Sequence, residues 1–209
     1  MSYKPGDVFI GVIDFFAILL PGALLVFFLI EPAKTHLFGK ILPSVNTEVQ
    51  AWVVFLFAAY LFGHFIFLLG SKIDFCYDLY RKRFLSSKSD EPYKSASIIR
   101  DKMMGKKDAE KICNTFQWSK ANVQLFYPEA AREIHRLEAD SKFFRSLIVV
   151  LFLVGIILFG QTAWIEGIIC FALMILSFLR YADQRWKSTR LAYIYLIALP
   201  AKKAVSAKD

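Results

Sequence analysis

Cysteine and histidine are rare in this chain of 209 residues, with three of each. The cysteines lie far apart, so they indicate reduced packing residues and not a disulfide framework; they are Cys76, Cys113 and Cys170. No P-loop, HExxH, GxSxG, CxxC or GxGxxG pattern occurs in the sequence, and each of these patterns carries a known catalytic or ligand-binding geometry. We therefore expect that the protein is not an enzyme and holds neither a cofactor nor a metal ion.

Charge is nearly missing from three long stretches, and this sets the class of protein. Hydrophobic residues make up 56% of the chain, whereas soluble domains are about 45–50% apolar. The apolar stretches are residues 8–30, 51–70 and 146–179, and roughly 18 apolar residues suffice for a transmembrane helix. The third stretch is long enough for two short spans with a turn near Gln161, which we expect, or for one tilted span followed by a re-entrant segment.

Lysine and arginine are unevenly distributed around these stretches. Residues 71–146 carry 16 of them and residues 180–209 carry 7, whereas the loop at 31–50 has only Lys34 and Lys40. Cytoplasmic loops carry the excess of basic residues. We therefore predict an all-α membrane protein of the bacterial inner (plasma) membrane. It has four transmembrane helices, a helical cytoplasmic insert between spans two and three, and cytoplasmic N- and C-termini.

The predicted parts follow from this topology. They are a first transmembrane hairpin at 1–70 (spans at about 8–30 and 51–70), the insert at 71–146, a second transmembrane hairpin at 147–182 and a basic amphipathic C-terminal tail at 183–209.

Helix signals run through the insert. A helix from Asp90 should end at Gly105, a second should start at Asp108, and a third should start at Pro128 and run into span three as one rod. An insert of this size has a marginal core, so we expect a homo-oligomer, possibly a tetramer, with helices packed between subunits. The apolar run at 191–199 is either an interfacial helix held to anionic lipid or a helix packed on the insert.

Two polar residues lie inside the predicted spans. Asp14 and His64 should have similar depth in the cytoplasmic half of the membrane, because span one runs outward and span two runs inward. Their contact would either lock the two helices together or line a pore or proton path; alternatively, Asp14 lies at the membrane interface. Pro21 and Gly22 predict a kink in span one, which is either a hinge or a packing bend.

The basic residues of the insert have two predicted roles. Arg81, Lys82 and Arg83 follow span two directly and are expected to face lipid. Other bases interleave with aromatic residues, a pattern that can hold a nucleotide or a single-stranded nucleic acid, although acidic residues dilute it and ordinary ion pairs on a solvated helix face would look the same. These ligand-binding candidates are Arg100, Lys106, Lys107, Trp118, Lys120, Arg132 and Arg136.

Three segments carry a resemblance to known proteins: LLPGALL in span one, YLFGH in span two and RLEADSKFFRSL at the entry to span three. With the overall architecture, they resemble small multi-span membrane effectors of bacterial antiphage defence systems, of the Hailong and Kiwa membrane-subunit type. The resemblance implies an ion-conducting or membrane-depolarising effector gated from the cytoplasm. It carries over no functional residue.

The functional prediction is therefore a homo-oligomeric channel or pore-forming effector. A nucleotide, an oligonucleotide or a protein signal would gate it from the cytoplasm. The alternative is a non-conducting membrane anchor or scaffold that recruits a soluble protein through the insert. A transporter subunit or lipid-acting enzyme that uses Asp14 and His64 is disfavoured by the missing catalytic motifs.

Overall fold

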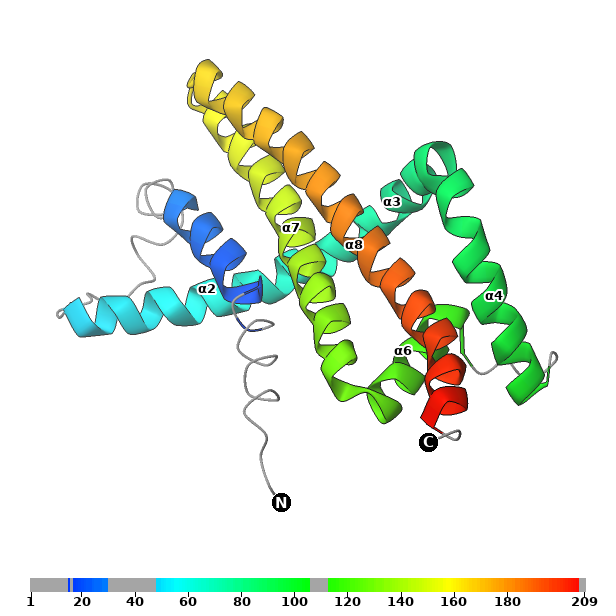
Figure 1. The fold of residues 1–209 in the computed structure, drawn as a ribbon. Helices are drawn as coiled ribbons and strands as arrows, with labels where there is room; N and C mark the ends of the chain where they lie inside the picture. The colour runs from blue at the N-terminus through cyan, green and yellow to red at the C-terminus, as the bar shows by residue number, and fades with distance from the viewer. Residues whose placement is uncertain (1–14, 16, 30–47, 106–112, 207–209) are drawn as a thin grey trace. The chain divides into compact units, whose positions relative to one another are not determined.

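The computed structural model describes residues 15, 17–29, 48–105 and 113–206. These residues form helices and short connections, without a β-strand among them (Figure 1). Three helices are long and apolar enough to cross a membrane: Glu48–Leu85, Pro128–Gly160 and Trp164–Ala198. The chain is thus an all-helical protein of membrane type. A shorter apolar helix, Ala17–Leu29, lies within the first predicted span.

The labelled elements follow one another closely along the chain. After the helix Ala17–Leu29 they are α2 (Glu48–Gly70), the 3₁₀ turn η1 (Ser71–Ile73), α3 (Asp74–Tyr80), the π-helical turn η2 (Arg81–Leu85), α4 (Ser86–Met104), α6 (Thr115–Phe126), α7 (Pro128–Gly160) and α8 (Trp164–Ser206).

The described residues fall into two compact units. The first holds the residues up to Cys76 together with Ala139–Tyr181, and the second holds Tyr77–Glu138 together with the residues from Ala182 onward. Helices α7 and α8 contribute residues to both units.

The first unit has an aliphatic core and an apolar surface. Its core joins Leu25 of the N-terminal helix, Ile66 of α2, and Val150 and Val154 of α7. Large apolar side chains are exposed along the outside of α2 and α8, among them Trp52, Phe57, Leu61, Ile168 and Leu176. In water such a surface would be an association site, whereas in a bilayer it faces lipid without cost.

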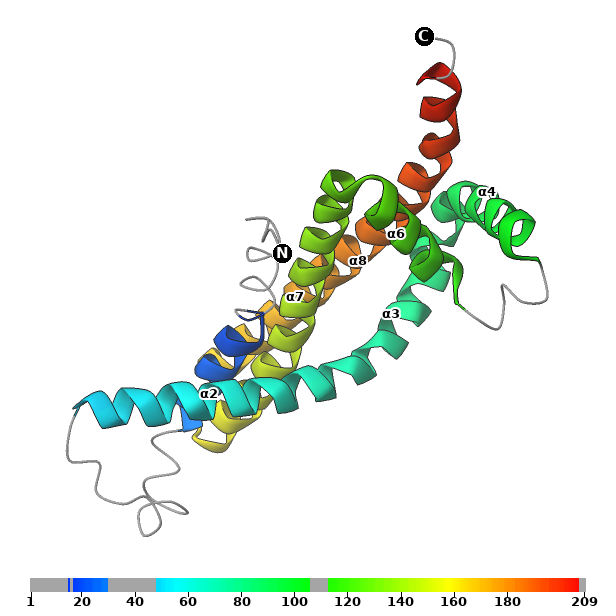
Figure 2. The same cartoon turned by 90° about the horizontal axis from the view of Figure 1, so that it is seen from below.

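Helices α7 and α8 form a hairpin within the first unit, and the two helices lie side by side in both views (Figures 1 and 2). The connection contains Thr162, whose φ of 63° is left-handed. A Cβ atom on Gly155 would lie 2.9 Å from the Phe171 ring, so the helices approach closely here. The predicted turn near Gln161 is confirmed, and α8 begins at Trp164 and continues as one long helix.

The second unit is built from α4, α6 and one end each of α7 and α8. Ala96, Trp118, Tyr193 and Leu196 form one core cluster. Tyr193 and Leu196 belong to the predicted tail, which in this unit packs on helices of the insert, the second of the two alternatives drawn from the sequence.

Helix boundaries in the second unit test the sequence signals. The predicted start at Asp90 is wrong, because α4 begins at Ser86, directly after η2. The predicted end at Gly105 is confirmed, because α4 stops at Met104 and Gly105 takes a left-handed φ of 80°. The start at Pro128 is confirmed too, and α7 continues unbroken to Gly160 as the predicted rod. The middle helix begins at Thr115, where the side chain of Asn114 accepts a hydrogen bond from the Gln117 amide; Asp108 lies outside the described residues.

Candidate functional site

A charged cluster lies in the first unit where its apolar helices end. Asp74 is the first residue of α3 and follows the end of α2 by four positions. Arg145 lies on α7 immediately before the apolar stretch 146–179, and Tyr181 lies on α8 just after it. The fold therefore brings together three residues that flank apolar segments in the sequence.

Hydrogen bonds and an aromatic ring surround the guanidinium of Arg145. Its Nη1 donates to both carboxylate oxygens of Asp74 at 3.2 Å, and the hydroxyl of Tyr181 donates to Oδ1 of the same carboxylate at 2.5 Å. The guanidinium carbon lies 4.8 Å from the centre of the Phe67 ring, within the range of a cation–π interaction. Asp74 is thus bridged to two other helices.

Burial makes this cluster energetically important. Arg145 is only 7% exposed and Tyr181 is fully buried, whereas the side chain of Asp74 is 34% exposed. Taking a charge pair out of water costs several kcal/mol per ion, and only good geometry with further hydrogen bonds repays it. Removing one partner of a buried pair leaves the other charge uncompensated and costs about 3–5 kcal/mol. The Asp74–Arg145–Tyr181 cluster can therefore hold α3, α7 and α8 in one arrangement.

Some polar atoms beside the cluster have no partner. Nε of Arg145 and Oγ of Ser146 are buried without a hydrogen bond. Close packing accounts for part of this, because a Cβ atom on Gly70 would lie 3.4 Å from Cγ and 3.5 Å from Nε of Arg145. Unsatisfied buried polar groups cost about 1–3 kcal/mol each.

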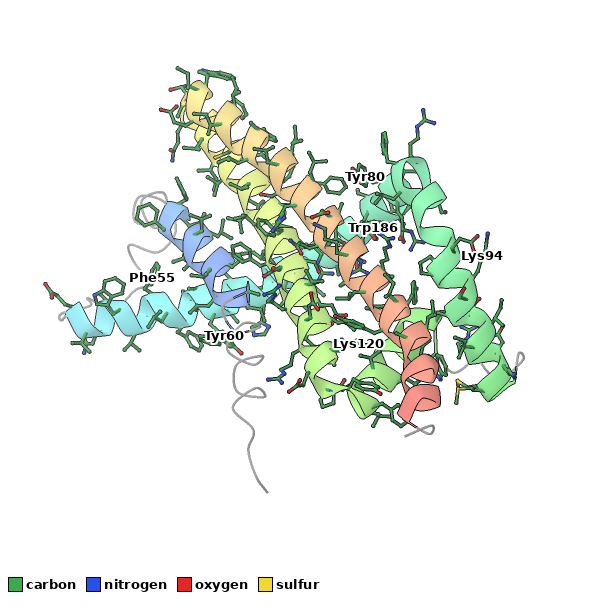
Figure 3. All side chains as sticks on the ribbon, viewed as in Figure 1. Phe55, Tyr60, Tyr80, Lys94, Lys120 and Trp186 are labelled. Atoms are coloured by element: carbon green, nitrogen blue, oxygen red, sulfur yellow. The ribbon has the colours of Figure 1, made fainter. Side chains whose placement is uncertain are left out.

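Of the predicted pair of Asp14 and His64, the structure describes only His64. Asp14 lies outside the described residues. His64 is exposed on α2, and its ring meets the edge of the Tyr60 ring with the two centres 4.6 Å apart; Tyr60 is labelled in Figure 3. The contact between the two predicted residues therefore stays a prediction.

Pro21 and Gly22 lie at a helix–helix contact. Pro21 is fully buried. A Cβ atom on Gly22 would lie 1.8 Å from the Ala59 carbonyl oxygen, and one on Gly63 would lie 2.3 Å from the Ile18 carbonyl oxygen. Ala59 and Gly63 are four residues apart on one face of α2, the small-xxx-small spacing that lets membrane helices approach closely. This geometry favours the packing role over the hinge.

The ligand-binding candidates of the second unit are largely engaged by its own groups. Arg100 is buried and donates to the Asp101 carboxylate and to the Cys113 carbonyl. Lys120 pairs with Glu138, and Trp118 packs in the core.

Four further bases belong to the candidate set. Arg132 pairs with Glu129 on the surface at 3.1 Å, and Arg136 is exposed. Lys106 and Lys107 lie outside the described residues. The contacts of the described candidates therefore do not gather them into one binding site.

The remaining sequence candidates are simple to place. Arg81, Lys82 and Arg83 are exposed in the π-helical turn η2. Among the residues that the structure describes, no group of three or more His, Cys, Asp or Glu side chains could hold a metal ion. Comparison with known protein families, with curated proteins and with solved structures found no match.

Sequence reasoning missed the Asp74–Arg145–Tyr181 cluster although a signal was present. The same depth argument that paired Asp14 with His64 applies to charges at the ends of apolar stretches. Asp74 and Arg145 both flank such stretches on the predicted cytoplasmic side. They looked like ordinary span-flanking residues, and only the packing of α3 against the hairpin in the first unit shows that Arg145 is buried.

Proposed function

We propose that this protein is the subunit of a homo-oligomeric membrane channel or pore that is controlled from the cytoplasm. The observation that carries the proposal is the Asp74–Arg145–Tyr181 cluster, in which the buried Arg145 and Tyr181 tie three helices together through Asp74 where the apolar parts end. A switch needs an element with two arrangements. The cluster supplies a contact that is either formed or broken.

Helix continuity supports control from outside the membrane. α7 runs without interruption from a charged part at Pro128–Asp140 to an apolar part that ends at Gly160, and α8 runs in the same way from Trp164 into a basic part. An unbroken helix transmits a tilt or rotation along its length. A signal that moves the charged parts would therefore move the apolar parts as well.

Several copies are required for conduction. The core of the first unit is aliphatic, with Leu25, Ile66, Val150 and Val154 in contact. Ions do not cross a packed aliphatic core, because a charge in low dielectric costs many kcal/mol. The conducting path of the proposed channel thus lies between subunits, as in the predicted homo-oligomer, for which four copies is our working number.

The resting state of the proposed channel has the cluster formed. Breaking the ion pair should free α3 from the hairpin and raise ion flux. We would reconstitute wild type, Arg145→Gln and the exposed-arginine control Arg190→Gln in liposomes and follow the decay of a potassium gradient. Faster decay for Arg145→Gln alone supports the channel; equal and background-level decay for all three excludes it.

A second candidate function is a non-conducting anchor that recruits a soluble protein. It is favoured by apolar side chains exposed on the second unit: Ile98, Met103 and Leu125. For an anchor, Asp14→Asn with His64→Ala should leave function intact, and Ile98→Ser with Met103→Ser should abolish capture of the partner. A loss of function in the first variant at a normal protein level favours the channel.

The finer topology also belongs to this proposal: four spans, with both termini in the cytoplasm of a bacterium. Reporter fusions test it. Alkaline phosphatase should be active after residue 40 and after residue 162, whereas green fluorescent protein should be fluorescent after residue 105 and after residue 209. Activity of the phosphatase at residue 105 would reverse the proposed orientation.

A role in antiphage defence rests on the resemblance of the three quoted segments. Cells that express the chain with its neighbouring genes should show fewer phage plaques than cells with an empty vector. They should also show fewer plaques than cells with Arg145→Gln, if uncontrolled opening of the channel removes its regulation. Equal plaque counts across a panel of unrelated phages would remove the defence role while leaving the channel open to test.

A further inference from the structure

A short basic and aromatic segment forms the end of the long helical stretch Glu48–Leu85. It comprises Leu79, Tyr80, Arg81, Lys82, Arg83 and Phe84, and we name it the basic–aromatic turn. The three bases fall in the π-helical turn η2, and all of them are exposed. None of the ion pairs given for the second unit uses them.

Large apolar side chains are exposed in the same segment. Leu79 is 64% exposed and Phe84 is 66% exposed. Tyr80, which is labelled in Figure 3, lies against Phe84 with ring centres 5.0 Å apart. Exposed leucine and phenylalanine beside three bases cost free energy in water, because their apolar area stays hydrated. At a membrane surface, the same side chains enter the acyl boundary while the bases meet headgroups.

A nearby helix adds one more base to this part of the second unit. The guanidinium carbon of Arg185 on α8 lies 5.5 Å from the centre of the Tyr77 ring, and Tyr77 is two residues before Leu79. Cations near an anionic leaflet gain about 1 kcal/mol each, which is roughly a fivefold gain in affinity per base. The bases and the exposed apolar side chains are thus both suited to the surface of an anionic membrane.

We propose that the basic–aromatic turn binds anionic phospholipid, with the bases on the phosphates and with Leu79 and Phe84 among the acyl chains. The inference goes beyond the proposed function, because it holds for a channel and for an anchor alike. Its occupant follows from charge complementarity and from the position of the turn at the end of the helical stretch Glu48–Leu85, which is long and apolar enough to cross a membrane. A solvated basic run that only fixes topology would show no lipid preference.

The test is lipid retention by the full chain. Wild type would be purified in mild detergent with an equimolar mixture of phosphatidylglycerol and phosphatidylcholine, and the retained lipids counted by native mass spectrometry. We expect enrichment of phosphatidylglycerol. Arg81→Gln with Lys82→Gln and Arg83→Gln should lower the enrichment at least about tenfold, given roughly fivefold per base. Equal retention of both lipids by wild type would overturn the proposal.

Two matched variants and one competitor separate specific binding from bulk charge. Lys94→Gln with Lys102→Gln and Lys187→Gln removes the same charge from exposed positions elsewhere in the second unit (Lys94 is labelled in Figure 3) and should keep the enrichment. Arg81→Lys with Arg83→Lys keeps the charge and should also keep the enrichment of phosphatidylglycerol. An equal loss in the control variant, or displacement of the lipid by millimolar inorganic phosphate, would contradict binding of the lipid at this turn.

Discussion

The two units use opposite means of packing. In the first, the backbones of the helix Ala17–Leu29 and of α2 lie so close that a Cβ on Gly22 or Gly63 would have no room. The core of this unit is aliphatic, and one charge cluster lies beside it. In the second, a core cluster with Trp118 and Tyr193 lies beside an aliphatic one, and ion pairs lie on partly exposed helix faces. A polar group that loses its partner therefore finds few replacement partners in the first unit and more in the second.

The ion pairs of the two units show this difference directly. The guanidinium of Arg145 is buried beside the Phe67 ring, so losing the carboxylate of Asp74, which is itself 34% exposed, leaves a positive charge in low dielectric. Lys120 and Glu138 have side chains 24% and 19% exposed, and Nδ1 of His135 lies 3.6 Å from the same carboxylate. Water and a second base can replace part of what the first base supplies.

The largest expected effect is on the glycine contact. Gly63→Leu places a side chain where a carbonyl oxygen lies 2.3 Å from the new Cβ, and backbone cannot retreat as a side chain can. We expect a loss of about 3 kcal/mol or more in unfolding free energy, seen as faster hydrogen–deuterium exchange in α2. Gly160→Leu is the matched control, because nothing lies within 4 Å of its Cβ position; equal loss in both would refute the close contact.

The next effect concerns the buried ion pair. Asp74→Leu should lower the unfolding free energy by about 3 kcal/mol, because the buried guanidinium of Arg145 loses its carboxylate partner. Asp74→Leu combined with Arg145→Met should regain most of that loss, since an apolar pair of similar volume is often as stable as a buried ion pair. Chemical unfolding in detergent measures both. An additive double variant would show that the two residues do not interact.

A smaller effect is expected from the partly exposed pair of the second unit. Lys120→Met should cost about 1.5 kcal/mol, the scale of a hydrogen bond to a charged group. Exchange should rise in α6 and leave α2 unchanged. A loss as large as that of Asp74→Leu would contradict the contrast between the units.

The smallest effect is at the hairpin turn. Thr162 has a left-handed φ of 63°, which costs a non-glycine residue roughly 1–2 kcal/mol. Thr162→Gly removes that strain but adds freedom to the unfolded chain, so the net gain should be about 0.5 kcal/mol. A small rise in the thermal midpoint in detergent checks it, and a fall would mean that the threonine side chain contributes more than its strain costs.

Much of the helical framework could be predicted from local patterns. Gly105 ends a helix, Pro128 starts one, and the chain turns near Gln161, because these signals depend on a few neighbouring residues. The long rod from Pro128 followed from the lack of any stop signal before the apolar stretch.

The candidate site could not be read in the same way. Asp74 and Arg145 are 71 positions apart, and each alone is an ordinary charge at the end of an apolar stretch. Their contact depends on how α3 packs against the hairpin, which no local pattern records. The role of Gly22 is similar, because its neighbours Ala59 and Gly63 come from another helix and show only in three dimensions.

The most direct test of the central claim exchanges the two charges of the cluster. Cells carrying wild type, Asp74→Asn, Arg145→Gln or the exchange Asp74→Arg with Arg145→Asp would be compared with a membrane-potential dye at equal amounts of inserted protein. The account predicts that each single variant depolarises the membrane and that the exchange restores the wild-type potential, at least in part. An unchanged potential in both single variants would contradict the claim that this ion pair holds a channel closed.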